Sequence, residues 1–154
     1  MKYIATVSRT AALLLLVALF TAGCSLFNNA ANERDQQNQA VTQGAVLGQI
    51  VTAEGIGTNN APVQETNSFS SSQDYIYAVV QASQIDQGTT MFARWSRDGK
   101  PFEDSSELKA DKAYKDTYVE FHLENLKDRM EPGDYSVQIF VNGNPAKQTD
   151  FTVK

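Results

Sequence analysis

Two residue types that often carry chemistry occur only once in this chain, as Cys24 and His122. His122 stands between Phe121 and Leu123 in an alternating segment, and the alternation directs its imidazole to solvent. No G-x-S-x-G, H-E-x-x-H or phosphate-binding glycine motif accompanies it. We therefore expect a solvated surface histidine rather than a general base or a zinc ligand.

A second candidate is the acidic run between residues 103 and 116, whose carboxylates could bind calcium or act as a pair in glycoside hydrolysis. Lysines are interleaved with these acids, which favours a solvated loop of nearly balanced charge. We expect no metal, no cofactor and no enzymatic activity. The acids are Glu103, Asp104, Glu107, Asp111 and Asp116, and the lysines are Lys109, Lys112 and Lys115.

The surroundings of Cys24 are more informative. Lys2 and Arg9 precede an apolar block over residues 11–20, and small residues follow it up to the cysteine. A membrane-spanning helix needs about 20 apolar residues, so this block is too short for a permanent anchor. A basic start, a short apolar middle and a small-residue exit predict a secretory signal peptide.

Ala22-Gly23-Cys24 resembles the lipobox of bacterial lipoproteins, although Thr21 stands where that family usually has an aliphatic residue. The resemblance implies that Cys24 receives a diacylglyceryl group and further acyl chains such as palmitate. It also implies that residues 1–23 are removed as a lipoprotein signal peptide. The alternative is an ordinary secreted protein with a free thiol, which an oxidising compartment disfavours.

Lipid on Cys24 would make the membrane a partner of this chain, because two or more acyl chains anchor a protein durably. In Gram-negative lipoproteins an aspartate after the cysteine tends to retain the protein at the inner membrane, and here Ser25 follows. The resemblance therefore implies the cell envelope. The location would be the outer membrane in a Gram-negative organism and otherwise the extracellular face of the cell membrane.

Charge and cysteine content limit what the mature chain can do. The net charge is −5, and it becomes −7 when the signal segment with its two cations is removed. An acidic chain without a basic patch repels phosphate backbones, so we expect no nucleic-acid partner. With Cys24 lipidated no disulfide can form, and an apolar core must stabilise the fold.

The composition divides the mature chain into two parts. Residues 24–45 contain the lipidated cysteine and a segment rich in Asn and Gln, which predicts a flexible linker. Residues 46–154 have short apolar or alternating segments separated by turn residues, including Asp98-Gly99 and Asn142-Gly143. The predicted strands cover residues 47–53, 74–83, 89–97, 117–125, 134–142 and 148–154, with a short edge strand inside 103–116.

These patterns predict an all-β, two-sheet β-sandwich of seven to eight strands that follows a signal helix and a disordered stalk. Trp95 on the third strand and Tyr135 after Pro132-Gly133-Asp134 resemble the buried tryptophan and the tyrosine corner of immunoglobulin-like domains. The resemblance implies that both side chains are structural and that residues 46–154 form one immunoglobulin-like module. Many such bacterial modules have no assigned activity.

One surface could bind a ligand. Phe92, Arg94, Gln138 and Phe140 all point away from the predicted core on two strands that are neighbours in this topology. An exposed aromatic patch there would suit an envelope protein or a glycan, whereas scattered apolar residues or cover from a loop would give it no function. We expect a membrane-anchored envelope lipoprotein whose non-enzymatic domain binds protein or acts as a spacer. A carbohydrate-binding module is the alternative.

Overall fold

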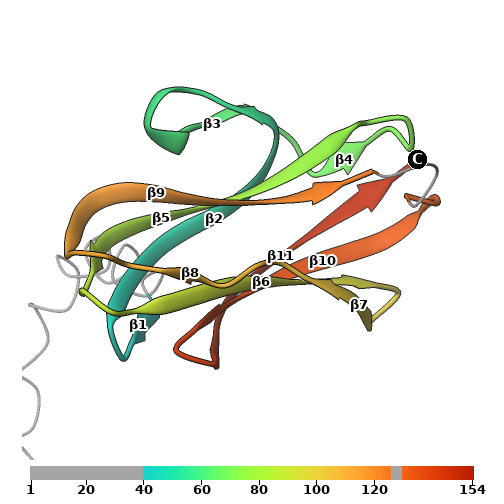
Figure 1. Cartoon of the computed structure of the whole chain (residues 1–154). Helices are drawn as coiled ribbons and strands as arrows, with labels where there is room; N and C mark the ends of the chain where they lie inside the picture. Colours follow the sequence, from blue (N-terminus) through green and yellow to red (C-terminus); the bar gives the residue numbers. More distant parts are fainter. Residues whose placement is uncertain (1–39, 126–129) are drawn as a thin grey trace, which may run out of the picture.

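A computed structural model of the chain describes residues 40–125 and 130–154. These residues form eleven strands and one short 3-10 turn, η1 (Thr58–Asn60), arranged as two facing sheets (Figure 1). Within them no helix has the length and apolar character needed to span a membrane. The predicted signal peptide and most of the predicted linker, including Cys24, lie outside the described residues.

The first sheet, sheet A, has the order β1-β2-β5-β9, with β3 paired to the end of β2. The second, sheet B, has the order β4-β11-β10-β6-β7, with β8 also paired to β6. The bounds in sheet A are β1 (Ala40–Thr42), β2 (Ala45–Ile56), β3 (Pro62–Glu65), β5 (Tyr75–Ile85) and β9 (Tyr114–Glu124). In sheet B they are β4 (Ser68–Phe69), β6 (Thr90–Arg97), β7 (Lys100–Asp104), β8 (Leu108–Lys109), β10 (Gly133–Val141) and β11 (Asn144–Val153).

This architecture confirms the predicted all-β, immunoglobulin-like sandwich. β2 and β5 pair antiparallel beside β9, and β6, β10 and β11 form the centre of the opposite sheet, as the A-B-E and C-F-G strands do in that fold. There are more strand segments than the seven or eight predicted, because five short pieces flank the long strands at the sheet edges. They are β1, β3, β4, β7 and β8.

The core lies between the sheets and follows the alternation of the strands. On β10 every second residue is buried, from Tyr135 through Val137 and Ile139 to Val141. β6 contributes Met91, Ala93 and Trp95 in the same way. Because β-strand side chains alternate between faces, the outward residues between these positions form the outer surface of sheet B.

Two hairpins form where the sequence predicts them. Asp98 and Gly99 join β6 to β7 with φ of 48° and 74°, and Asn142 and Gly143 join β10 to β11 with φ of 48° and 78°. A type I′ turn needs positive φ at both central residues, which Asn, Asp and Gly adopt most readily. These two turns set the register of β10 with β11 and of β6 with β7.

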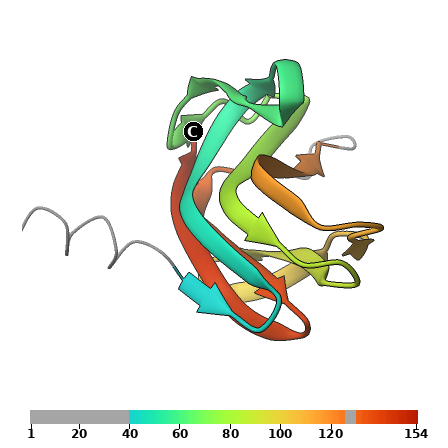
Figure 2. The ribbon, with the colours of Figure 1, turned by 90° about the vertical axis from the view of Figure 1, so that its left-hand side faces the viewer.

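The folded region begins earlier than the sequence predicts. Residues 40–45, assigned above to the linker, form β1 and the turn into β2, and β1 lies beside the red β11 at the edge of the sandwich (Figure 2). The turn is fixed by side chains that are distant in the sequence. The side-chain amide of Asn142 donates to the backbone carbonyl of Gln43 (2.6 Å), and the hydroxyl of Thr89 donates to the backbone carbonyl of Gly44 (2.9 Å). Such long-range hydrogen bonds leave no local pattern in the sequence.

The acidic run also contains more strand than predicted. β7 extends to Asp104, β8 follows at Leu108, and both pair with β6. Between them Ser105 continues the ladder, because its Oγ accepts from the Ala93 N–H (2.9 Å) and its own N–H donates to the Ala93 carbonyl (2.8 Å). β9 then begins at Tyr114, ahead of the predicted Thr117.

Candidate functional site

The four residues of the predicted binding patch do meet on the outer surface of sheet B. β6 and β10 are paired so that Phe92 lies opposite Phe140, and Arg94 lies opposite Gln138. The two phenyl rings stack with centroids 4.6 Å apart and planes 7° from parallel. The strand register therefore creates the aromatic pair that alternation and topology predict.

An arginine covers this pair. The guanidinium carbon of Arg94 lies 5.0 Å from the centroid of Phe140 and 5.8 Å from that of Phe92, within cation–π range. Asp104 on β7 holds the guanidinium through two hydrogen bonds of 2.7 Å, a bidentate arrangement. Phe140 is only 9% exposed. The outer layer of this patch is thus an ion pair, with the Phe140 ring buried beneath it and the Phe92 ring partly exposed.

The same ion pair sets the electrostatics of the patch. Hydrogen bonding to Arg94 lowers the pKa of the Asp104 carboxyl below its ordinary value of 3.8, and the reciprocal bond raises the pKa of Arg94. Both groups therefore stay charged around neutral pH. Because the pair is well exposed, it contributes little to stability.

The two predicted structural residues lie in the core, and both pack against Phe151. Trp95 is fully buried and meets the Phe151 ring edge-on at 6.1 Å, while Tyr135 stacks on that ring at 5.3 Å. The Tyr135 hydroxyl donates to the Glu131 carbonyl at 2.8 Å, four residues upstream, which is the hydrogen bond of a tyrosine corner. Burial raises the pKa of the Tyr135 phenol.

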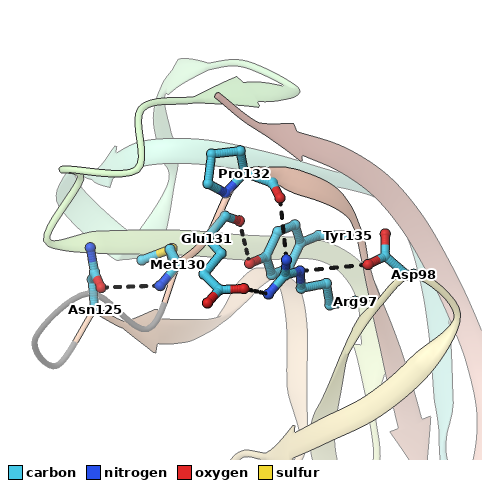
Figure 3. A network of polar contacts seen from close by, with 7 residues as sticks. All are labelled: Arg97, Asp98, Asn125, Met130, Glu131, Pro132 and Tyr135. Atoms are coloured by element: carbon cyan, nitrogen blue, oxygen red, sulfur yellow. Dashed lines mark hydrogen bonds and ion pairs between the residues drawn. The ribbon is translucent and has the colours of Figure 1, made fainter.

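A polar network surrounds this corner (Figure 3). Arg97 pairs with the carboxylate of Glu131, donates to the Pro132 carbonyl (3.4 Å) and lies 3.6 Å from Asp98. Its guanidinium also lies 6.0 Å from the centre of the Tyr135 ring. The network ties the end of β6 to the residues that lead into β10.

In the described residues, His122 and two acids of the run have nearby side-chain partners. The His122 side chain is 50% exposed, and its Nδ1 lies 3.3 Å from Glu120. In the acidic run Asp104 binds Arg94, and Asp111 accepts from the Tyr114 hydroxyl. Within residues 40–125 and 130–154 no three His, Cys, Asp or Glu side chains are grouped as metal ligands.

Sequence reasoning missed a second aromatic cluster, on the outer face of sheet A. Tyr75 and Tyr77 project from β5 beside His122 on β9, with ring centroids between 5.7 and 6.1 Å apart. The Tyr75 hydroxyl donates to Glu124 at 3.1 Å, a bond that raises the pKa of Tyr75. The i, i+2 spacing of the two tyrosines was the available signal, but the continuous apolar run over 75–80 concealed which face they occupy.

No family model matches the chain, and no curated protein matches it. Among solved structures, an immunoglobulin-like protein from Pseudomonas aeruginosa is similar, with a TM-score of 0.47 and 14% identity over 70% of this chain and 93% of that one. A β-glucosidase from Erythrobacter marinus has a TM-score of 0.42 and 12% identity, and one from Listeria innocua has 0.37 and 13%.

The two glucosidase similarities cover 70% and 71% of this chain but only 15% and 16% of the enzymes. This chain therefore spans about a sixth of each enzyme. The immunoglobulin-like assignment rests on the strand order, the buried tryptophan and the tyrosine corner described above.

Proposed function

We propose that this chain is a lipid-anchored protein of the bacterial cell envelope, in which an immunoglobulin-like domain without enzymatic activity binds another protein or acts as a spacer. The observation that carries the proposal is the lipobox-like Ala22-Gly23-Cys24 placed shortly before a folded sandwich. In a Gram-negative organism, Ser25 after the cysteine favours attachment to the outer membrane. In any other organism, the protein would be attached to the extracellular face of the cell membrane.

The spacing between anchor and domain supports this arrangement. Fifteen residues, 25–39, separate Cys24 from the first residue of β1. Even fully extended they would reach about 50 Å, at 3.3 to 3.6 Å for each residue. A domain tethered in this way stays close to the membrane, where it can meet membrane-bound or wall-bound partners and not distant ones.

The distribution of charged groups supports a non-enzymatic role. The two arginines on β6 are engaged with Asp104 and with Glu131, both at the surface. His122 has a carboxylate neighbour but lies in a ring cluster on an open sheet face. Catalytic acids and bases instead converge in a cleft that excludes water.

The carbohydrate-binding alternative receives less support from the same residues. Sugar-binding modules of the type considered above need exposed ring faces, whereas Arg94, held by Asp104, lies over the buried Phe140 ring. Protein binding does not depend on exposed ring faces at the Phe92–Phe140 pair.

Membrane fractionation tests the proposal. We expect wild-type protein to incorporate labelled palmitate and to sediment with membranes, and the Cys24→Ala variant to lose both properties. Ser25→Ala is the matched control, because it alters the neighbouring residue but keeps the thiol and should remain in the membrane fraction. A Cys24→Ala protein that still sediments with membranes would contradict lipid anchoring.

A further inference from the structure

β9 is a free edge of sheet A. It pairs with β5 along its whole length, and no other strand of the described residues pairs with its opposite side. The chain enters the domain at β1, which is at the other end of the sheet order. The unpaired N–H and C=O groups along β9 therefore form a ready template for one more strand.

This edge lacks most of the features that block strand addition. Proteins protect free edges with lysine, proline, bulges, very short strands or a covering helix or loop. Of the described residues, the η1 turn contacts β9 without pairing with it. On β9 such irregularity is confined to the beginning, where Lys115 precedes Asp116 with a φ of 46°. From Thr117 to Glu124 there is no Lys, Arg, Gly or Pro. This half of the edge is regular and long enough to pair with an extended segment.

The opposite sheet extends further than sheet A does. β6 contacts β9 across the sandwich, so β7 and β8, which lie outside β6, face the position next to β9 (Figure 1). Leu108 on β8 is directly opposite Met91, a core residue, and directly opposed residues in an antiparallel pair share a face. Leu108 therefore projects to the inner side of sheet B, yet it is 45% exposed.

Phe102 on β7 shows the same lack of cover. Its ring meets the buried Tyr135 edge-on at 6.0 Å, yet Phe102 remains 47% exposed. Leu108 and Phe102 are two of the few large hydrophobic side chains exposed in the described residues. A strand added to β9 would pass over this inner side, and its inward side chains would shield both residues from water.

Charge indicates what the outward side chains of an added strand should be. Glu120, His122 and Glu124 line the outer face of β9. Across all strands of sheet A the only lysine or arginine is Lys115. The carboxylates of these strands are Glu54, Glu65, Asp116, Glu120 and Glu124.

Opposite charges on neighbouring strands attract and like charges repel. A second copy of β9 would bring Asp116, Glu120 and Glu124 of each chain close together, which disfavours self-pairing. Residues 25–39 of this chain contain Glu33 and Asp35 beside Arg34, without an alternating apolar pattern. A basic segment of another polypeptide fits better than either.

We propose that residues 117–124 of β9 bind an extended segment of a partner protein as an additional strand of sheet A, with apolar side chains directed at Leu108 and Phe102 and basic side chains beside Glu120 and Glu124. This inference rests on the proposed role in protein binding and names its surface and its partner class.

The test uses the full-length chain in detergent micelles and a blocked peptide of alternating lysine and valine, about eight residues long, as strands commonly are. Calorimetry should detect binding, and hydrogen exchange should show new protection of amides in residues 117–124. A peptide of alternating glutamate and valine should bind at least about tenfold more weakly. So should a lysine–valine peptide N-methylated at alternate positions, because it cannot complete the strand ladder.

Variants of the protein locate the site. The double variant Glu120→Lys, Glu124→Lys should weaken binding of the lysine–valine peptide at least about tenfold. Leu108→Asp should also weaken its binding. Asp150→Lys is the control, because it makes the charge change of one of the two glutamate substitutions on β11 of sheet B and should leave binding unchanged. Circular dichroism confirms that each variant is folded.

Three outcomes would overturn the inference. These are no binding of the lysine–valine peptide, equal binding of a lysine–valine peptide with scrambled order, or a stable dimer in which β9 is protected without any peptide. Equal binding of the scrambled peptide would indicate simple charge attraction. A stable dimer would indicate that the edge binds a second copy of the chain. None of these results affects membrane attachment through Cys24, so failure here is distinguishable from failure of the proposed anchoring.

Discussion

Trp95 is the largest of the fully buried side chains, and its ring packs against Phe151 in the middle of the core. Its indole N–H has no hydrogen-bond acceptor among the described residues, so its contribution to stability comes from packing and burial. Removing such a ring leaves a cavity that the surrounding strands can fill only in part. The stability of the sandwich therefore depends strongly on the side chain at this one position of β6.

We predict that Trp95→Ala lowers the free energy of unfolding by about 3 to 5 kcal/mol. Urea titration followed by far-ultraviolet circular dichroism measures it without relying on tryptophan fluorescence. Phe102→Ala is the control, because Phe102 is half exposed and its loss should cost about 1 kcal/mol or less. Equal losses for the two variants would contradict the placement of Trp95 in the core.

The Arg94–Asp104 pair makes a prediction about pH. Its hydrogen bonds lower the pKa of Asp104 in the folded protein, so the folded state favours the ionised form. The resulting stability is present above the unfolded pKa, near 3.9, and is lost as the pH falls through the folded value. We expect a carboxyl NMR titration to place the pKa of Asp104 below 3.8, and Arg94→Gln to raise it. An unchanged pKa in that variant would show that the pair does not persist in solution.

At the scale of elements, the β1–β2 turn depends on a glycine. Gly44 has a φ of +99°, and a methyl group there would lie 2.6 Å from the Thr89 hydroxyl oxygen and 2.9 Å from the Asn142 amide nitrogen. Those two side chains provide the hydrogen bonds that hold this turn. Any side chain at this position would both strain the backbone and displace the groups that fix the hairpin.

Gly44→Ala should therefore destabilise the domain by about 2 to 4 kcal/mol, the sum of a conformational and a steric penalty. Gly88→Ala separates the two effects, because Gly88 also has a positive φ, +86°, but has nothing within 4 Å of the added methyl. It should cost only about 1 to 2 kcal/mol. Chemical denaturation of both variants measures the difference, and a Gly44 variant no worse than the Gly88 variant would refute the tight turn.

The elements that sequence reasoning predicts are those with local signals. Alternation identifies β6, β9 and β10, and the Asp-Gly and Asn-Gly pairs identify two hairpins. β1 is missed because its support comes from Asn142, 99 positions away from Gln43. The extent of β7 and β8 is missed because Ser105 bridges them with a side chain, which no periodicity reveals.

The same difference between local sequence signals and long-range contacts holds for the candidate sites. Phe92 and Phe140 can be expected to meet, because strand order and alternation determine which outward residues are neighbours. The cover over them depends on the Arg94 rotamer and on where β7 lies, and neither is encoded in a local pattern. The exposure of Leu108 is likewise visible only once both sheets are placed, because it depends on how far sheet B extends past β9.

At the scale of the whole molecule, the two sheets differ in charge as well as in width. Sheet A is acidic and ends at the free edge of β9, whereas the strands of sheet B contain three lysines and two arginines among their acids. A domain held near a membrane at its amino-terminal side could thus present an acidic edge to basic segments of its neighbours. Anchoring is the premise of this arrangement, because it determines which partners the domain meets.

Intact-mass spectrometry of the protein extracted from membranes tests that premise most directly. We predict a mature chain that begins at Cys24, with a mass equal to residues 24–154 plus a diacylglyceryl group and, where the amino terminus is acylated, one further acyl chain. A mature chain that begins at another residue, or one that carries Cys24 as a free thiol, would contradict lipid anchoring.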